Sequence, residues 1–342
     1  MKQAQQRKEG QSAIAACRAD FPELDQDVNG IQLVYLDSAA SAQQPSAVID
    51  AMARYESHDH ANVHRGVHTL SHRATDAYEG ARETIRRFVN AASTSEVVFT
   101  SGTTESINLV AQSFCRPNLG PGDKVLITHL EHHANIVPWQ LVCEQTGAEL
   151  LVAPINDRGE LELDALYALM SDEVRLLAIA HVSNALGTIN PIRDIIAAAH
   201  AREIPVLVDG AQGVPHMQVD VRDLDCDFYA FSGHKMFGPT GTGVLYGKES
   251  LLDAMPPYKG GGDMILEVSF SGTTFNELPY KFEAGTPNIS GVVGLGAAAE
   301  YLENIGMEAV ESWESELSNY MTEQLSSIED MRLIGTAAHK AG

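Results

Sequence analysis

The sequence predicts an α/β fold in which a mostly parallel central sheet is covered by helices on both faces. Between about residues 95 and 250, short and nearly continuous apolar runs alternate with segments whose apolar residues recur at helical spacing. Strands that are apolar on both faces are typical of parallel sheets buried between helices. The chain has 342 residues, of which 44% are hydrophobic, so it can bury a core of this size.

The predicted strands and helices alternate along this region. Strands are expected at 97–100, 124–128, 149–153, 174–180, 205–208, 228–231 and 243–246, and helices at 103–114, 135–145, 163–170 and 192–201. The glycines at 260–262 interrupt the pattern and predict a loop. Beyond them, apolar residues from Val310 to Leu325 recur at helical spacing, which predicts a helix that packs on a second, smaller domain.

These elements divide the chain into three parts. The polar residues 1–30 form an N-terminal arm, residues 31–290 form a large domain, and residues 291–342 form the start of a small C-terminal α/β domain. The strand that begins near Met331 is cut short by the end of the sequence, so we expect this smaller domain to be incomplete.

Charge and cysteine content restrict the classes of function. The chain carries 23 Lys and Arg against 46 Asp and Glu, a formal charge of −23, which argues against binding to nucleic acid or to an anionic membrane. Its four cysteines are scattered without a CxxC pair, so they form no disulfide framework and fit a reducing compartment. The N-terminus has no signal-peptide pattern, and no apolar run reaches the roughly 18 residues of a spanning helix. We therefore expect a cytoplasmic protein.

Polar residues follow the carboxyl ends of five predicted strands, where parallel sheets bind ligands. These segments are 101–105, 129–135, 181–184, 209–212 and 232–235. Each also has an ordinary structural explanation. Asp209 can cap a helix, and Gly102 with the hydroxyl residues after it can begin a helix without binding an anion. Lys235 can be a surface lysine, although burial would lower its pKa and make it an amine nucleophile.

Taken together, the five segments match the needs of pyridoxal 5′-phosphate (PLP). Its phosphate needs a helix N-terminus such as the one after Gly102, and its aldehyde needs a lysine such as Lys235. Its pyridine nitrogen needs a carboxylate such as Asp209 to keep a proton there, and an imidazole can lie over the ring. The sequence therefore predicts PLP as the cofactor.

Two groups of histidines raise the alternative of a metal site. They are His58, His60, His64, His68 and His72 in one stretch, and His129, His132 and His133 in another. Residues 64, 68 and 72 would share a helical face, but Gly66 interrupts the helix and no carboxylate stands at ligand spacing. No cysteine or second cluster supports zinc at 129–133. We therefore expect no metal.

Six motifs resemble those of a known enzyme family. They are DGAQ (209–212), SGHK (232–235), GTTE (102–105), EHHAN (131–135), HRG (64–66) and FEAGTPN (282–288). Over about residues 30–335 the chain resembles the SufS-type (group II) cysteine desulfurases. These are PLP-dependent enzymes with the type I transferase fold, which they share with class V aminotransferases. The resemblance thus implies this fold and this cofactor.

The resemblance also implies a role for each matching residue. Lys235 would bond covalently to PLP and, once the substrate displaces it, take the α-proton. Asp209 would pair with the pyridine nitrogen and Gln212 with the ring hydroxyl, while His132 would stack on the ring and move protons. The phosphate would be held by Thr103, Thr104, Ser232 and His234, and by Thr286 of the other subunit in a homodimer. Asn184 would approach the substrate carboxylate or the ring, and His64 and Arg65 would line the entrance.

The implied reaction removes sulfur from L-cysteine, leaving L-alanine and a persulfide that passes to a sulfur-acceptor protein for iron–sulfur cluster assembly. The family's nucleophilic cysteine lies well over a hundred residues beyond the lysine. Here 107 residues follow Lys235 and none is a cysteine. The family's arginine for the substrate carboxylate, which lies further on, is absent too. All four cysteines are expected to be core residues, among them Cys143 in a helix and Cys226 before a buried strand.

We therefore expect either a fragment of a full-length desulfurase or a truncated product, and we expect the 342 residues alone not to mobilise sulfur. Other readings stay open. Selenocysteine or cysteine sulfinate could be the preferred substrate, as in a selenocysteine lyase. A class V aminotransferase-like enzyme would instead yield pyridoxamine phosphate and a keto acid. An inactive PLP-binding homologue could serve as a partner subunit, although the combination of His132, Asp209 and Lys235 argues against it.

Overall fold

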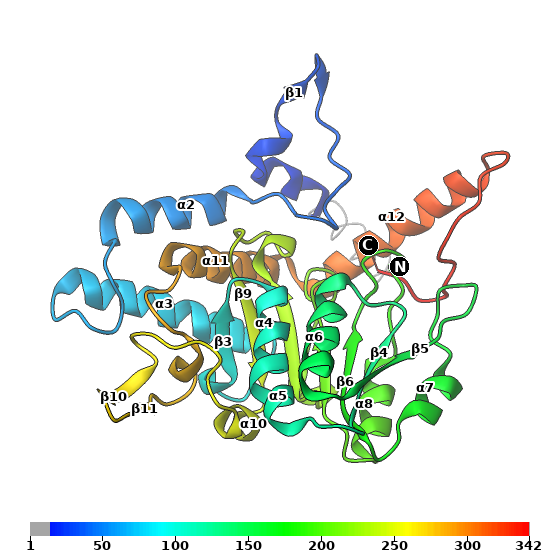
Figure 1. The fold of residues 1–342 in the computed structure, drawn as a ribbon. Helices are drawn as coiled ribbons and strands as arrows, with labels where there is room; N and C mark the ends of the chain where they lie inside the picture. The colour runs from blue at the N-terminus through cyan, green and yellow to red at the C-terminus, as the bar shows by residue number, and fades with distance from the viewer. Residues whose placement is uncertain (1–13, 342) are drawn as a thin grey trace.

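The computed structural model of the chain describes residues 14–341 and contains a seven-stranded sheet at its centre (Figure 1). The strand order is β3-β9-β8-β7-β6-β4-β5. Their bounds are β3 Val97–Thr100, β4 Lys124–Thr128, β5 Glu149–Ala153, β6 Val174–Ala180, β7 Val206–Asp209, β8 Phe228–Ser232 and β9 Gly243–Gly247. Only β9 runs against its neighbours, so the predicted mostly parallel α/β sheet is confirmed.

Helices cover both faces of this sheet. One face carries α3 Thr69–Phe88, α7 Leu163–Leu169, α8 Ile192–His200 and α11 Ile289–Ile305, and the other carries α4 Thr103–Val110, α6 Val137–Thr146 and α10 Glu249–Ala254. Alternate strand residues enter the two cores: Leu126 packs in the first, while Val125 and Ile127 pack with α6 in the second. Burial on both faces explains why the strands read as continuous apolar runs.

Two predicted helices differ from the structure in their bounds. The helix expected at 103–114 is α-helical only to Val110, and a π-helical turn, Ala111–Cys115, leads into the short helix α5 Arg116–Asn118. The helix expected at 135–145 begins later, at Val137, because Asn135 belongs to a 3₁₀ turn, His133–Asn135. The side-chain amide of Asn135 donates to Glu131. Both differences lie at element ends, where sequence patterns are least informative.

The predicted loop at 260–262 is confirmed, but the hairpin after it was not expected. The hairpin comprises β10 Ile265–Ser269 and β11 Gly272–Phe275 and lies at the lower left of Figure 1. It exposes Leu266, Val268 and Phe270 to solvent in the single chain. Its apolar residues Leu266, Val268 and Phe270 alternate with the polar Glu267 and Ser269, a strand pattern that the sequence analysis missed.

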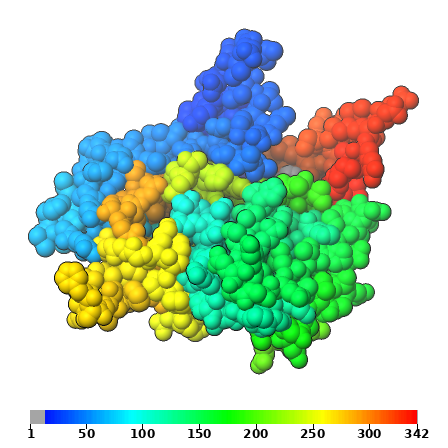
Figure 2. Space-filling view, viewed as in Figure 1, coloured from blue at the N-terminus to red at the C-terminus, as the bar shows by residue number. Residues whose placement is uncertain are grey.

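Two segments project from the body of the molecule, one before α2 and the other formed by the end of α12 and the loop after it, whereas the last residues return to the body, where Lys340 bridges to Thr188 (Figures 1 and 2). A short ribbon of β1 Asp27–Val28 and β2 Ile31–Gln32 lies above α2 Ser46–Arg54 in this view. The predicted C-terminal helix is confirmed as α12 Met307–Ser326, in which only Met307 is buried. Its packing on a smaller domain, and the division at 30 and 290, stay predictions, and residues 1–13 of the predicted arm lie outside the described residues.

No helix within residues 14–341 is long and apolar enough to cross a membrane.

The short helix α9 Val221–Leu224 precedes β8 and is followed by Asp225, a residue in the left-handed conformation.

Candidate functional site

A cavity of about 360 Å³ lies at the carboxyl edge of the parallel strands. Nine predicted site residues line it, contributed by the segments that follow five different strands: Thr103, Thr104, His132, Asn184, Asp209, Gln212, Ser232, His234 and Lys235. Its remaining lining is small and apolar: Ala39, Ala40, Ala134, Ala180, Val182 and Ala211. The structure thus brings together residues that span more than a hundred positions of the chain.

One side of the cavity is formed by the N-terminus of α4. The backbone N–H of Thr103 donates to Ser232 Oγ at 2.8 Å, and the Thr103 and Ser232 hydroxyl oxygens are 2.7 Å apart. Gly102 has φ +153°, and a Cβ at Gly243 on β9 would lie 2.4 Å from its Cα, so glycine is needed at both positions. The Thr103 and Ser232 hydroxyls and the positive end of the α4 dipole meet here, which favours the binding of an anion.

Lys235 and Asp209 face the same cavity. Burial lowers the pKa of Lys235, with Asp209 opposing that shift, and burial raises the pKa of Asp209 against the effects of the Ala211 N–H, Lys235 and His132. One Asp209 oxygen accepts from the Ala211 N–H at 3.0 Å. Within the described chain, neither the other oxygen nor the Lys235 amine has a hydrogen-bond partner. Both groups are therefore available to a ligand.

His132 lies beside them at the start of the 3₁₀ turn. Its Nδ1 accepts from the Ala134 N–H at 3.1 Å, so the ring in this arrangement carries its proton on Nε2. Desolvation, assisted by the Lys235 charge, lowers the pKa of His132. The neutral form of the imidazole is thus favoured. A neutral imidazole can accept a proton near neutral pH, as a proton-transferring histidine must.

Behind His132 lies a buried network that the sequence analysis missed. Glu131 accepts from the Thr128 hydroxyl and the Asn135 amide, both at 2.6 Å, and from the Ala180 N–H at 3.1 Å. Asn135 in turn accepts from the indole N–H of Trp139 at 2.8 Å. This network ties the ends of β4 and β6 together under the site. Burial raises the pKa of Glu131 to about 8, and its position inside the EHHAN motif was the available signal.

A second buried pair supports the turn that carries Asp209. The His181 Nδ1 and the Tyr229 hydroxyl are 2.9 Å apart, and both side chains are buried. A Cβ at Gly210 would lie 1.9 Å from the Tyr229 ring, so the turn can rest on that ring only with glycine there. The sequence analysis grouped His181 with the site, but the structure makes it a support behind the cavity wall.

Three predicted residues lie outside the cavity lining of the single chain: His64, Arg65 and Thr286. The His64 Nε2 contacts Glu79 at 2.9 Å, and Arg65 forms an ion pair with Asp263. Thr286 is exposed, in a turn that begins with Glu283. Since α3 begins only at Thr69, the three histidines considered for a metal do not share a helical face. No cluster of potential metal ligands occurs within residues 14–341.

None of the four cysteines forms a disulfide within the described residues, and none lines this cavity. Cys115, Cys143 and Cys226 are buried, and desolvation raises the pKa of each, so their prediction as core residues is confirmed. For Cys17 the prediction is wrong: this residue lies half-buried in a 3₁₀ turn, Cys17–Asp20, ahead of the sheet.

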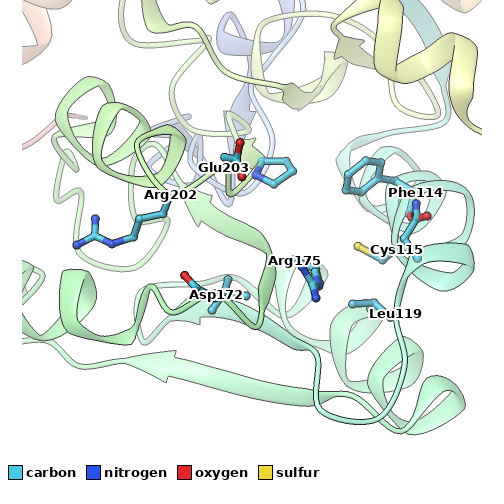
Figure 3. Close-up of a pocket in the computed structure, with 10 residues that line it drawn as sticks. Phe114, Cys115, Leu119, Asp172, Arg175, Arg202 and Glu203 are labelled. Atoms are coloured by element: carbon cyan, nitrogen blue, oxygen red, sulfur yellow. Dashed lines mark hydrogen bonds between the residues drawn. The ribbon is translucent and has the colours of Figure 1, made fainter.

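A second cavity, of about 350 Å³, lies at the amino edge of β6 and β7 (Figure 3). Phe114, Cys115 and Leu119 form its apolar side, and charged residues stand around its rim. The Arg175 guanidinium donates to Asp123 at 2.7 Å and Arg202 to the Ala198 carbonyl at 3.0 Å. Since its arginines are engaged by the protein, this cavity offers no comparable set of available groups.

The first cavity fits PLP on the evidence of its own groups. The phosphate of PLP requires an anion-binding position, which the N-terminus of α4 with Ser232 provides. Its aldehyde requires an amine without a protein partner, and its pyridinium requires a carboxylate oxygen such as the second one of Asp209. Glycine at 243 lets β9 approach the Gly102 backbone closely, which brings the N-terminus of α4 to the cavity. The small alanines of the lining leave room for a flat ring.

Comparison with known proteins agrees with this assignment. The aminotransferase class-V family profile matches residues 34–342. The chain is 55% identical over 328 residues to a cysteine desulfurase of Synechococcus elongatus, covering 96% of this chain and 52% of that protein. It is also 55% identical to a cysteine desulfurase of Escherichia coli, covering 94% of this chain and 80% of that protein.

A solved structure shows the same fold. The cysteine desulfurase CsdA of Escherichia coli superposes with a TM-score of 0.84 at 45% identity, covering 92% of this chain and 77% of that one. The chain thus spans about half the length of the Synechococcus relative and about four-fifths of the Escherichia coli relative. On the identity, the fold and the profile together, this chain belongs to the cysteine desulfurases of the aminotransferase class-V family.

Proposed function

We propose that this chain holds PLP in the cavity at the carboxyl edge of the sheet and supplies the cofactor-binding residues of a SufS-type cysteine desulfurase, whose reaction also needs an acceptor thiol. In the reaction, the C–S bond of L-cysteine breaks, an S–S bond forms to an acceptor thiol, and the carbon receives a proton in place of sulfur. L-alanine and a persulfide result. The observation that carries the proposal is a partly buried amine and a buried carboxylate, Lys235 and Asp209, facing one cavity without mutual hydrogen bonding.

PLP, when bound, supplies the electron sink that makes the α-carbon of the amino acid acidic. The protein's residues bind it and move protons. Because burial lowers the pKa of Lys235, its amine is available to bond to the aldehyde and then to accept a proton. Asp209 would hold a proton on the ring nitrogen, and His132 would lie over the ring. The proposed phosphate ligands of the chain itself are Thr103, Thr104, Ser232 and His234.

The substrate is proposed to enter beside Asn184, an exposed amide that lines the cavity. Its amide can donate to the substrate carboxylate. Transfer of the sulfur needs a thiol, and no cysteine of the described chain lines the cavity. We therefore expect the 342-residue polypeptide to release no alanine above background. The names of its relatives, which are cysteine desulfurases, support L-cysteine as the substrate. A sulfur-acceptor protein of iron–sulfur cluster assembly is the proposed destination of the persulfide.

A homodimer with Thr286 donated across its interface is part of the proposal. Thr286 is exposed, and its turn is anchored by Glu283, which accepts from Arg82 at 2.7 Å and from the Phe99 N–H at 2.7 Å. The nearby hairpin β10–β11 leaves apolar side chains on the surface that a second copy would cover. His64 and Arg65 are proposed to line the entrance of the assembled site.

Mixed dimers test this arrangement. Neither Lys235→Ala nor Thr286→Ala alone should form a site that binds PLP as the wild type does. Co-expression of the two variants with different tags should restore one complete site per mixed dimer, because Lys235 and Thr286 then come from different chains. A mixed dimer that binds PLP no better than either parent would contradict the shared site.

A reducing cytoplasmic setting is proposed because none of the four cysteines forms a disulfide within the described residues.

Cofactor binding and substrate response together test the function. Chain purified with PLP should keep about one PLP per chain through dialysis and absorb in the near-visible range. L-cysteine should change that spectrum more than D-cysteine does, and Asn184→Ala should weaken the difference. A chain that loses its PLP as readily as the Lys235→Ala variant would overturn the proposal.

A further inference from the structure

Gln212, a buried residue of the cavity wall, is held from behind by a histidine outside the predicted site. The Gln212 Nε2 donates to the Ala39 carbonyl at 2.7 Å. Its Oε1 lies 3.3 Å from the Nε2 of His216. The amide therefore uses its oxygen and one of its two N–H groups on the protein, and a single N–H remains for the cavity.

His216 is itself fixed by a carboxylate of α12. Its Nδ1 lies 2.9 and 3.1 Å from the two oxygens of Glu314, which is 98 positions further along the chain. An ionised carboxylate only accepts hydrogen bonds, as does the Gln212 Oε1, so both ring nitrogens of His216 must carry protons in this arrangement. His216 thus bridges Glu314 and Gln212, and its side chain is 17% exposed.

We propose that His216 and Glu314 fix the orientation of the Gln212 amide so that it presents an N–H donor, and not a carbonyl oxygen, to the ligand. A flipped amide would place its NH₂ group against the protonated His216 ring and its oxygen against the Ala39 carbonyl. Both contacts would be repulsive, so the flip is disfavoured. A donor at this position suits an anionic oxygen on an aromatic ring, such as the ring hydroxyl of PLP, so the inference rests on the proposed function.

His216 and Glu314 are positioning residues in this account, since neither lines the cavity. Their contact also joins the wall of the cavity to α12, a helix that is otherwise mostly exposed. The orientation of a cofactor-binding amide therefore depends on a contact far away in the sequence.

Four variants test the proposal through the spectrum and the affinity of bound PLP. His216→Leu should weaken PLP binding roughly three- to tenfold, the value of one hydrogen bond, and shift the near-visible absorption maximum. Gln212→Leu should do the same, and the double variant should add little to either, because both remove one interaction. His216→Gln, whose amide can still donate to Oε1, should restore most of the wild-type spectrum. Glu314→Gln should give a smaller change in the same direction.

His200→Leu is the matched control. His200 is also paired with a carboxylate, Asp227 at 2.8 Å, but at the amino edge of the sheet. It should lose thermal stability without changing the PLP spectrum. If His216→Leu and Glu314→Gln both keep the wild-type spectrum and affinity while Gln212→Leu changes them, the positioning role is wrong. If the wild type shows no bound PLP at all, the proposed function fails first and this inference with it.

Discussion

The two edges of the central sheet carry cavities of nearly equal volume, yet only one of them is a candidate site. At the carboxyl edge, Lys235 and one oxygen of Asp209 have no hydrogen-bond partner within the described chain. At the amino edge, Arg175 and Arg202 donate to groups of the protein. Cavity volume therefore does not identify the site, whereas available polar groups do.

The side chains that support the sheet also differ in burial from one region to another. Behind the carboxyl edge, the buried side chain of Glu131 accepts three hydrogen bonds from the protein. At the amino edge, Arg175 forms a half-exposed pair with Asp123. Beside β3, Arg82 and Glu283 form a buried ion pair, and because a buried charge that loses its partner is far more costly than an exposed one, breaking that pair should cost more than breaking a surface pair.

The largest effect is expected from breaking the Arg82–Glu283 pair. The Arg82 side chain is fully buried, and that of Glu283 is 7% exposed. Arg82→Met leaves the Glu283 carboxylate buried without its partner and should lower the free energy of unfolding by about 3–5 kcal/mol. The control is Arg175→Met, which breaks a half-exposed pair with Asp123 and should cost at most about 1 kcal/mol. Urea titrations measure the free energy of unfolding of both variants, and equal losses would contradict the expected difference between buried and exposed ion pairs.

Asp209→Ala should affect cofactor binding more than any residue at the amino edge does. Loss of one charge-assisted hydrogen bond, about 1.5–3 kcal/mol, weakens PLP binding roughly 10- to 150-fold. The control Asp172→Ala changes a carboxylate at the other cavity and should leave the affinity unaltered. Equilibrium dialysis with PLP distinguishes the two variants, and a similar loss in both would refute the assignment of Asp209.

Glu131 gives a dependence of stability on pH. Burial raises its pKa to about 8 in the folded chain from an ordinary value of 4.5, so folding takes up a proton between these values. Raising the pH therefore favours the unfolded state across this window, by on the order of 1.4 kcal/mol per pH unit at most. Urea midpoints of the PLP-free chain should fall from pH 5 to pH 8, and Glu131→Gln should flatten that fall. A variant with the same slope as the wild type would exclude Glu131 as its source.

The smallest effect is expected at the rim of the second cavity. Arg202 is exposed there and donates only to the Ala198 carbonyl, within its own segment of the chain. Arg202→Gln should change PLP affinity by no more than about twofold, the range of ordinary surface substitutions. A tenfold change in dialysis would show that the amino edge takes part in binding after all.

The strands and most of the cavity wall could be predicted because both leave local signals. A strand buried on two faces, such as β7, is a continuous apolar run, and the residue that ends it, Asp209, lies at the ligand edge by the geometry of parallel sheets. Resemblance to a known family then supplied the roles of residues whose positions alone left two explanations open.

What could not be predicted depends on contacts between distant segments. Nothing local to Ala39 indicates that its carbonyl would accept from Gln212, 173 positions away. The pairing of His216 with Glu314 likewise requires α12 to return to the sheet. The hairpin β10–β11 was missed for a different reason: its apolar and polar residues alternate over a short stretch only, and its side chains are almost all exposed, so no buried core marks it.

The central claim is that Lys235 is the amine that bonds to PLP. Borohydride reduction of the PLP-loaded chain, followed by digestion and mass spectrometry, tests it most directly, because reduction makes the link permanent. We predict one phosphopyridoxyl group, on the peptide that contains Lys235, and none in Lys235→Ala. A group on Lys259 or Lys281, or a reduced adduct that persists in Lys235→Ala, would contradict the account.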